Sequence, residues 1–305
     1  MALVFVFPGQ GSQAVGMGRA LGEQSPRWAE AQAALGFDLR RLCFEGPEAE
    51  LLLTANTQPA ILATSIVALD VLTAAGIHPK MVAGHSLGEY SALVAAGGLG
   101  FADALRTVRA RGQFMQEAVP AGEGAMAAIL GLDRALVAQV CAEAASAGPV
   151  QVANLNGPGQ TVIAGATAAV KQAAELAKAK GAKRAVLLPV SAPFHSALLA
   201  PAAARLAAVL REVPFHDLRV PVVTNVDAEL LTEGARVADT LVRQVTAPVR
   251  WEEVVLRMVK EGATTFVEVG PGKVLSGLIR RIAPDARVLN VEDQASLAIA
   301  REALK

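Results

Sequence analysis

The chain has 305 residues, of which 53% are hydrophobic and 18% are charged, and this composition excludes an intrinsically disordered protein. Its 28 basic and 28 acidic residues give a formal net charge of zero. This balance argues against a general nucleic-acid or membrane-surface binder, because such proteins need a cationic surface. The length favours one large domain with a smaller one inserted in it or appended to it.

The N-terminal segment is predicted to be the first strand of the fold and not a signal peptide. Its short apolar run, Leu3–Phe7, has no basic residue before it and ends at Pro8. The two cysteines, Cys43 and Cys141, are isolated in the sequence, which fits a reducing compartment and gives no zinc-site spacing. No uninterrupted apolar run reaches the roughly 18 residues that span a bilayer. We therefore expect a cytoplasmic protein without a membrane segment or a metal.

Strands and helices are predicted to alternate along most of the chain. Short apolar runs predict strands at Leu3–Phe7, Met81–Gly84, Val220–Val226, Thr264–Val269 and Arg287–Val291. Helical spacing or alanine-rich composition predicts helices at Trp28–Leu35, Pro59–Ala75, Leu87–Ala96, Ala102–Ala118, Ala200–Ala208, Arg236–Gln244, Trp251–Glu261 and Val274–Arg281. Such an alternation indicates an α/β fold with a mostly parallel sheet that is covered by helices on both faces.

The segment 123–189 has a different order of elements. Strands are expected at Ala125–Leu130, Val150–Leu155, Thr161–Gly165 and Arg184–Pro189, with helices at Asp133–Ala147 and Ala168–Ala179. This βαββαβ order is the ferredoxin-like pattern. We therefore predict that 123–189 is a small domain inserted into a large domain formed by 1–122 and 190–305, and that the two line a cleft.

The sharpest local motif is Gly84-His85-Ser86-Leu87-Gly88, which lies between an expected strand and an expected helix. This is the setting of a nucleophile elbow, a tight turn that exposes a reactive serine. Glycines flank the serine because neighbouring backbones pass close to such a turn. The motif predicts Ser86 as a nucleophile and the backbone N–H of Leu87 as an oxyanion donor. A glycine-rich turn with an incidental serine is the alternative.

A serine nucleophile needs a general base, and histidine is the usual one. Of the four histidines, His195 is the best candidate because it follows the point where the inserted segment returns to the large domain. A purely structural histidine is the alternative at that position. His78 and His216 lie near expected surface turns, and His85 is expected to support the elbow.

Several other polar residues are expected near the cleft. The first loop, Gly9-x-Gly11-x-x-Ala14, weakly matches a dinucleotide fingerprint, and the alternative is a second oxyanion N–H donor. Asn154 and Asn156 precede a glycine-proline-glycine turn and are turn residues or face the cleft. Candidates to hold a substrate carboxylate, against a solvated helix face as the alternative, are Arg106, Arg109 and Arg111.

Eight motifs in a fixed order together resemble the malonyl-CoA:acyl-carrier-protein transacylase family over nearly the whole chain. They are FPGQGSQ at 7–13, TQPA at 57–60, GHSLGEYSAL at 84–93, ARG at 110–112, NGPGQTVIAG at 156–165, PFHS at 193–196, QVTAPVRW at 244–251 and EVGPGKVLSGLI at 268–279. The resemblance implies an α/β-hydrolase-like large domain with an inserted ferredoxin-like small domain.

The resemblance also implies catalytic roles. Ser86 would carry the acyl group as an ester, with His195 as its general base. The backbone N–H groups of Gln10 and Leu87 would form the oxyanion hole. The backbone carbonyl of Gln244, and no acidic side chain, would orient His195.

Substrate-binding residues follow from the same resemblance. Arg111 would bind the malonyl carboxylate, and Gln58 and Asn156 would line the site. Phe194 would limit branching at the α-carbon of the acyl group, as it does in malonyl-selective members.

The implied reaction is a ping-pong transfer of malonyl from malonyl-CoA to the phosphopantetheine thiol of acyl carrier protein in fatty-acid synthesis. No permanently bound cofactor and no nucleic-acid or membrane partner is expected. The alternatives are a serine hydrolase, an acyltransferase domain of a polyketide synthase, and an inert carrier-binding or nucleotide-binding module. An acidic carrier would favour a basic rim, for which the candidates are Lys178, Lys180, Lys183, Arg184, Arg280 and Arg281.

Overall fold

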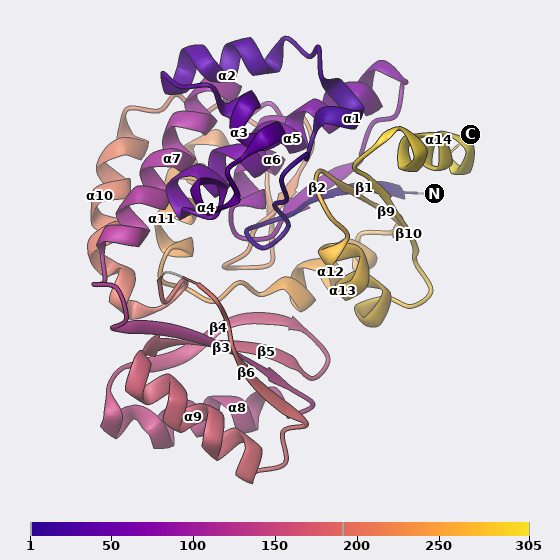
Figure 1. Cartoon of the computed structure of the whole chain (residues 1–305). Coiled ribbons are helices and arrows are strands. Elements are labelled where there is room, and N and C mark those ends of the chain that lie inside the picture. Colours follow the sequence, from indigo (N-terminus) through magenta and orange to yellow (C-terminus); the bar gives the residue numbers. More distant parts are fainter. Residues whose placement is uncertain (1, 191, 305) are drawn as a thin grey trace.

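The computed structural model describes residues 2–190 and 192–304. Within this part of the chain, two sheets organise the fold, and Figure 1 shows the smaller sheet with its helices below the larger unit. The strand order is β10-β9-β1-β2-β7-β8 in the six-stranded sheet and β4-β5-β3-β6 in the four-stranded sheet. The predicted fold class, a mostly parallel α/β sheet with a second small sheet, is confirmed.

The large sheet is parallel except at one edge, where β7 and β8 form an antiparallel pair. Its strands are β1 (Ala2–Phe7), β2 (Met81–Gly84), β7 (Val222–Val223), β8 (Leu230–Leu231), β9 (Ala263–Val269) and β10 (Arg287–Val291). The predicted strand Val220–Val226 is too long, because the chain turns back after Val223 to pair with β8.

Helices pack on both faces of this sheet. They are α1 (Arg19–Gly22), α2 (Arg27–Leu35), α3 (Leu39–Glu45), α4 (Glu48–Leu51), α5 (Thr54–Ala74), α6 (Gly88–Ala95), α7 (Phe101–Glu117), α10 (Ala200–Arg211), α11 (Val237–Gln244), α12 (Trp251–Lys260), α13 (Val274–Ile282) and α14 (Gln294–Ala303). Short 3₁₀ turns occur at Ala145–Ala147, Ala197–Leu199 and Gly234–Arg236.

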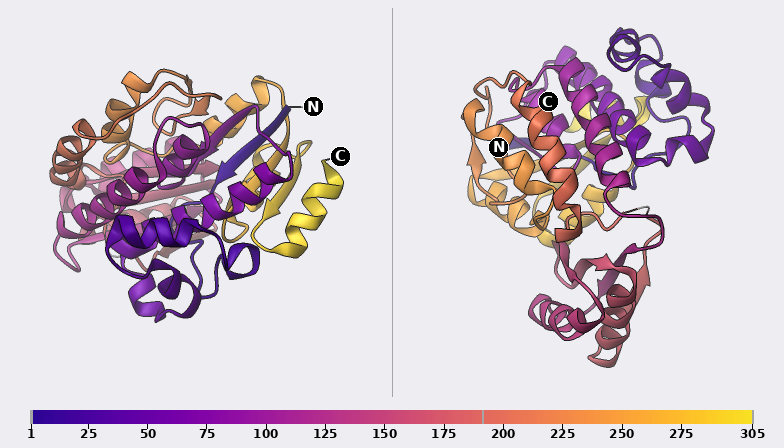
Figure 2. Two further views of the ribbon diagram at one scale, coloured as in Figure 1. Left: turned by 90° about the horizontal axis from the view of Figure 1, so that it is seen from above. Right: turned by 90° about the vertical axis from the view of Figure 1, so that its left-hand side faces the viewer.

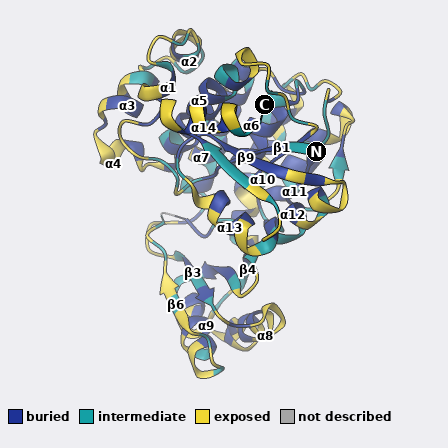
Figure 3. Cartoon of the chain, turned by 90° about the vertical axis from the view of Figure 1, so that its right-hand side faces the viewer, coloured by how far each residue is buried: buried dark blue, intermediate teal, exposed yellow. Residues whose placement is uncertain are grey.

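Strand β1 divides the core in two, because its side chains alternate between the faces of the sheet. Phe5 and Phe7 join the apolar cluster that includes the side chains of α5, α6 and α7. Val4 and Val6 join a second cluster with the side chains of α12 and α13. All four are fully buried, and Figure 3 shows the buried residues concentrated along the central strands.

Helix α5 is the long central helix of the larger core. Its length and composition would allow it to cross a membrane, but 72% of its most apolar window is buried inside the protein. The prediction that it begins at Pro59 is wrong, since the helix begins at Thr54. The first turns are held by Thr57, whose hydroxyl donates to the carbonyl oxygens of Leu51 and Leu53.

The four-stranded sheet is antiparallel and belongs to the predicted insertion. Its elements are β3 (Gly124–Leu130), α8 (Arg134–Ala144), β4 (Val150–Gly157), β5 (Gln160–Ala166), α9 (Thr167–Ala179) and β6 (Arg184–Leu187). Their order along the chain is βαββαβ, and the two helices cover the outer face of the sheet in the right-hand view of Figure 2. The boundaries 123–189 for the small domain remain a prediction.

Backbone pairing fastens the small sheet to the large unit beside the elbow. The N–H of Val249 donates to the carbonyl oxygen of Ala153 at 2.9 Å, and the N–H of Leu155 donates to that of Val249 at 2.9 Å. Strand β4 therefore lies against the segment that follows α11. This contact fixes one wall of the cleft relative to the end of β2.

Candidate active site

Ser86 lies in the turn between β2 and α6 with a left-handed backbone, at a φ of +53°. A non-glycine residue rarely takes this conformation, and strained nucleophile elbows are one place where it occurs. A Cβ on Gly84 would lie 1.9 Å from the backbone of Gly88, and one on Gly88 would lie 2.1 Å from the carbonyl oxygen of Phe7. The flanking glycines are therefore required by the close approach of three backbone segments.

We expect Gly88→Ala to destabilise the protein by about 1–3 kcal/mol, because its new methyl group would overlap the backbone of β1. Urea denaturation of both proteins measures this change. The matched control is Gly277→Ala in α13, where an added Cβ meets nothing within 4 Å. That control should gain about 0.5–1 kcal/mol from helix propensity. Equal stability of the two variants would contradict the packing argument.

The side chain of Asn225 stabilises the strained turn. Its Oδ1 accepts a hydrogen bond from the N–H of Ser86 at 2.7 Å, and its Nδ2 donates to the carbonyl oxygen of Gly84 at 2.7 Å. Asn225 is fully buried and follows the short strand β7. Sequence reasoning missed this residue, since a single asparagine after an apolar run carries no distinctive signal.

Ser86 and His195 lie 109 residues apart in the sequence but are in direct contact. The distance from Ser86 Oγ to His195 Nε2 is 2.7 Å, and His195 Nδ1 lies 2.8 Å from the carbonyl oxygen of Gln244. Because a carbonyl oxygen can only accept, Nδ1 carries the proton and Nε2 is free to accept the serine proton. The geometry is that of a nucleophile and its general base.

The surroundings of His195 keep its imidazole neutral. Burial, with a further contribution from the positive charge of Arg111, lowers the pKa of His195 to about 3. The side chain therefore stays unprotonated throughout the neutral pH range. A neutral imidazole is the form that can accept a proton from Ser86.

Arg111 lies on α7 and is only 2% exposed. Its two terminal nitrogens donate to the side-chain oxygens of Gln58 and Gln244, both at 2.9 Å, and one of them also contacts Ser86 Oγ at 3.1 Å. Among the described residues, its Nε has no hydrogen-bond partner. The guanidinium therefore reaches Ser86 Oγ and still has a donor free.

The predicted oxyanion donors belong to residues that line one cavity with Ser86. The backbone N–H groups of Gln10 and Leu87 donate to no acceptor within residues 2–190 and 192–304, and both residues line the same cavity as Ser86. The side chain of Gln10 turns toward Thr54, at 3.3 Å between Nε2 and Oγ1. The two N–H groups are thus free to bind an anionic oxygen.

A cavity of about 510 Å³ opens over these groups. Of the predicted site residues, it is lined by Gln10, Gln58, Ser86, Leu87, Arg111, Phe194 and His195. Asn154 is the asparagine in the lining, whereas Asn156 contacts the site through His85, with its Oδ1 2.8 Å from His85 Nε2. Gln244 does not line the cavity, but it contacts both His195 and Arg111.

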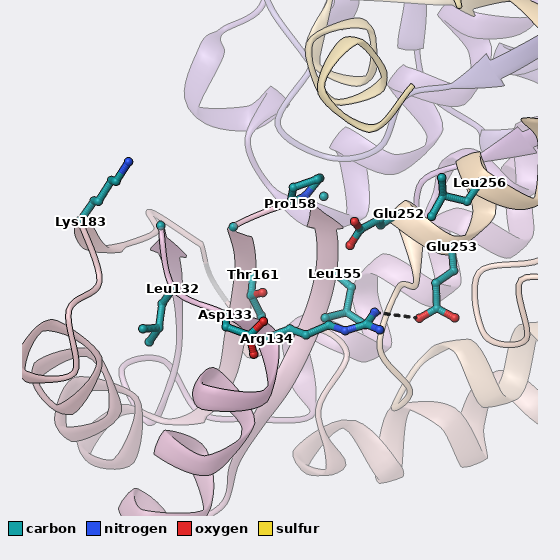
Figure 4. A pocket seen from close by; sticks show the side chains of 13 residues that line it. Leu132, Asp133, Arg134, Leu155, Pro158, Thr161, Lys183, Glu252, Glu253 and Leu256 are labelled. Atoms are coloured by element: carbon teal, nitrogen blue, oxygen red, sulfur yellow. Dashed lines mark ion pairs between the residues drawn. The ribbon is translucent and has the colours of Figure 1, made fainter. Parts of the chain in front are cut away.

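Other sequence candidates lie elsewhere. Arg106 pairs with Asp103 on the exposed face of α7, and Arg109 stacks on the ring of Phe37. A second cavity of about 790 Å³ is lined by residues of β4, β5, the turns beside them and α12. Figure 4 shows Lys183 at its edge, and none of the residues predicted for the active site lines it. The described residues contain no group of three side chains suited to a metal ion.

Glu89 is a buried acid close to the site that sequence reasoning did not single out. It is 1% exposed and lies in the first turn of α6. Burial raises its pKa to about 7, although hydrogen bonds from Gln244 and Asn225 and the charge of Arg111 oppose the rise. The signal that could have found it is its position in the GHSLGEYSAL motif.

A serine at a strand-to-helix elbow, bonded to a histidine above a mostly parallel sheet, is typical of the class of serine hydrolases and acyltransferases. The chain matches the acyl transferase domain family over residues 4–300. It is 51% identical to the malonyl CoA-acyl carrier protein transacylase of Bacillus subtilis, over 99% of this chain and 97% of that protein. The chain belongs to the malonyl-CoA:acyl carrier protein transacylase family.

Solved structures agree with this assignment. The acyl-carrier-protein S-malonyltransferase of Burkholderia pseudomallei superposes with a TM-score of 0.97 at 50% identity, covering 99% of this chain and all of that one. A malonyl-transacylase solved in complex with its type II polyketide acyl-carrier protein gives a TM-score of 0.97 at 46% identity, covering 99% of this chain and 100% of that chain. The resemblance predicted from the eight motifs is confirmed.

Proposed function

We propose that this chain transfers a malonyl group from coenzyme A to the phosphopantetheine thiol of acyl carrier protein, through an ester on Ser86. The transfer supplies the extender unit for fatty-acid synthesis and needs no permanently bound cofactor. Its two halves use the same site in turn, because the first product leaves before the carrier arrives.

In the first half-reaction, His195 Nε2 takes the proton of Ser86 as Oγ attacks the thioester carbonyl carbon. The backbone N–H groups of Gln10 and Leu87 hold the resulting oxyanion. The carbon–sulfur bond then breaks, and coenzyme A leaves as a thiol with the proton from His195. The malonyl group remains as an ester on Ser86.

In the second half-reaction, the thiol of the carrier takes the place of coenzyme A. His195 removes its proton and the sulfur attacks the ester carbonyl, again with the oxyanion held by the same two N–H groups. The ester bond breaks, Ser86 Oγ recovers the proton, and malonyl leaves on the carrier. The backbone carbonyl of Gln244 stabilises the protonated His195 in both halves.

The position of Arg111 is the observation that carries the choice of a malonyl substrate. Its terminal nitrogen is 3.1 Å from Ser86 Oγ, so the carboxylate of an acyl group on Ser86 is within reach of the guanidinium. Burial lowers the pKa of Arg111 because it disfavours the charged form, and no carboxylate contacts it directly among the described residues. A malonyl carboxylate would supply the missing counter-charge through paired hydrogen bonds.

Sequential mixing tests the proposed function. Brief exposure to malonyl-CoA should add one malonyl group to the intact protein, and later addition of holo acyl carrier protein should move that group to the carrier. In His195→Ala we expect both steps to slow by about 10²–10⁴-fold, the usual contribution of a general base. Release of free malonate without a carrier would indicate the hydrolase alternative. A parallel comparison of malonyl transfer to an acyl carrier protein of fatty-acid synthesis and to one of polyketide synthesis distinguishes between these two pathways.

We place this reaction in the cytoplasm. The family assignment and the two buried free thiols, Cys43 and Cys141, support a reducing compartment.

A further inference from the structure

One carboxylate oxygen of Glu89 links the elbow to Gln244, the residue that contacts both His195 and Arg111. Oε2 of Glu89 accepts from the backbone N–H of Asn225 at 3.0 Å and from Nε2 of Gln244 at 2.9 Å. Asn225 holds the elbow through its side chain, as described above. Glu89 therefore ties the strained turn to α11, although Glu89 and Gln244 lie 155 residues apart.

The side chain of Gln244 has its amide orientation fixed from both ends. Arginine can only donate and a backbone carbonyl can only accept, so Oε1 must face Arg111, and Nε2 must face the carbonyl oxygen of Ser86 and the carboxylate of Glu89. Nε2 donates to the carbonyl oxygen of Ser86 at 3.0 Å. The contact from Oε1 to Arg111 is 2.9 Å, and it holds the guanidinium beside the nucleophile.

Gln244 contacts His195 and Arg111 through two different chemical groups. His195 is bonded to its backbone carbonyl, whose position depends on α11, and Arg111 is bonded to its side-chain oxygen. Loss of Glu89 would release the side chain and leave the backbone in place. The consequence should fall on Arg111 and spare the Ser86–His195 pair.

We propose that Glu89 is a positioning residue for malonyl selection: by anchoring the amide of Gln244, it aims Arg111 at the carboxylate of the acyl group. Glu89 serves without forming an ion pair with Arg111, since Gln244 lies between them. This arrangement leaves the guanidinium open to the substrate carboxylate. The inference rests on the proposed function, because it assumes that Arg111 binds malonyl.

The test compares acylation by malonyl-CoA and acetyl-CoA in Glu89→Met and Glu89→Gln. Methionine fills similar space and offers only a weakly accepting sulfur, whereas the amide oxygen of glutamine can accept both hydrogen bonds. We expect Glu89→Met to lower kcat/KM for malonyl-CoA by about 10- to 100-fold, the size of a lost bond to a charged group. Acetyl-CoA should change by less than about threefold, because it has no carboxylate for Arg111. Glu89→Gln should restore the malonyl-to-acetyl ratio.

Glu268→Met is the matched control. Glu268 is also fully buried and accepts two N–H bonds, from Leu275 and Ser276, at a helix start away from the cavity. Substitution of Glu268 should lower the stability of the protein and leave the malonyl-to-acetyl ratio unaltered.

Three results would overturn the proposal. The first is an unchanged malonyl-to-acetyl ratio in folded Glu89→Met, and the second is a ratio in Glu89→Gln as low as in Glu89→Met. The third is a change of the same ratio in the Glu268 control that equals the change in Glu89→Met. If Glu89→Met does not fold, Glu89→Asp decides, because its shorter carboxylate cannot reach both donors and should lower the ratio. An unchanged ratio in that variant would overturn the proposal. If the wild-type protein itself formed no malonyl ester or showed no preference over acetyl, the proposed function would have failed, independently of Glu89.

Discussion

The Ser86→Ala variant is expected to gain no mass on incubation with malonyl-CoA, whereas the wild-type protein gains one malonyl group. The hydroxyl oxygen is the atom that forms the ester, and alanine removes this single side-chain oxygen while keeping the Cβ and the backbone of the elbow. In a serine protease, loss of the nucleophile costs roughly 10⁶-fold in rate. Intact-protein mass spectrometry after brief mixing measures the ester directly, with acetyl-CoA in parallel.

The control for this experiment is Ser91→Ala. Ser91 lies on α6, the helix that follows the elbow. It is fully buried, and its hydroxyl has no partner among the described residues. It should acquire the malonyl mass at the wild-type rate. An adduct that persists in Ser86→Ala would show that another residue carries the acyl group, and Ser86 would lose its proposed role.

Arg111→Ala is expected to lower kcat/KM for malonyl transfer by roughly 10²–10³-fold, because a buried carboxylate would lose its hydrogen-bonded counter-charge. The kcat/KM for acetyl transfer should fall far less, so the ratio of malonyl to acetyl transfer decreases. A second effect follows at His195. The positive charge of Arg111 contributes to the lowered pKa of His195. Removal of that charge should therefore raise the pKa of His195 and shift the acidic limb of the pH–rate profile to higher pH.

The control is Arg111→Lys, which keeps a positive charge but loses the planar pair of donors. We expect it to be intermediate in malonyl transfer, and thermal unfolding of all three proteins separates loss of binding from loss of fold. Arg111→Ala also leaves the side-chain oxygens of Gln58 and Gln244 without their donor. Unchanged selectivity in a folded Arg111→Ala variant would make Arg111 a structural residue only.

Local sequence determined the elbow. The order of strand, Gly-x-Ser-x-Gly and helix predicts a tight turn, because only glycine tolerates backbones as close as those around Gly84 and Gly88. The predicted strand Met81–Gly84 matches β2, and the ferredoxin-like order of the insertion followed from short apolar runs, helical stretches and the Gly-Pro-Gly turn at 157–159. These features depend on neighbours in the chain, which is why a single sequence predicts them. The start of α5 at Thr54 was not predicted, because the apolar helical spacing on which the prediction rested begins only after Pro59.

The catalytic and binding roles of the site residues were predicted from the family resemblance, whereas their contacts with one another are seen only in the folded structure. Sequence position alone left His195 open between a base and a structural histidine, and it did not separate Arg111 from Arg106 and Arg109. The tertiary structure brings His195 to 2.7 Å from Ser86 and buries Arg111 beside it, while its two neighbours on α7 point elsewhere.

The fold class, the elbow and the family of this protein can be predicted from the amino-acid sequence, because ordered motifs and local periodicity carry that information along the chain. The contacts of Asn225 with Ser86 and of Glu89 with Gln244 become visible in the folded protein alone. A hydrogen bond between side chains depends on their direction and burial. For partners more than a hundred residues apart, those are set by how the sheet and its helices pack.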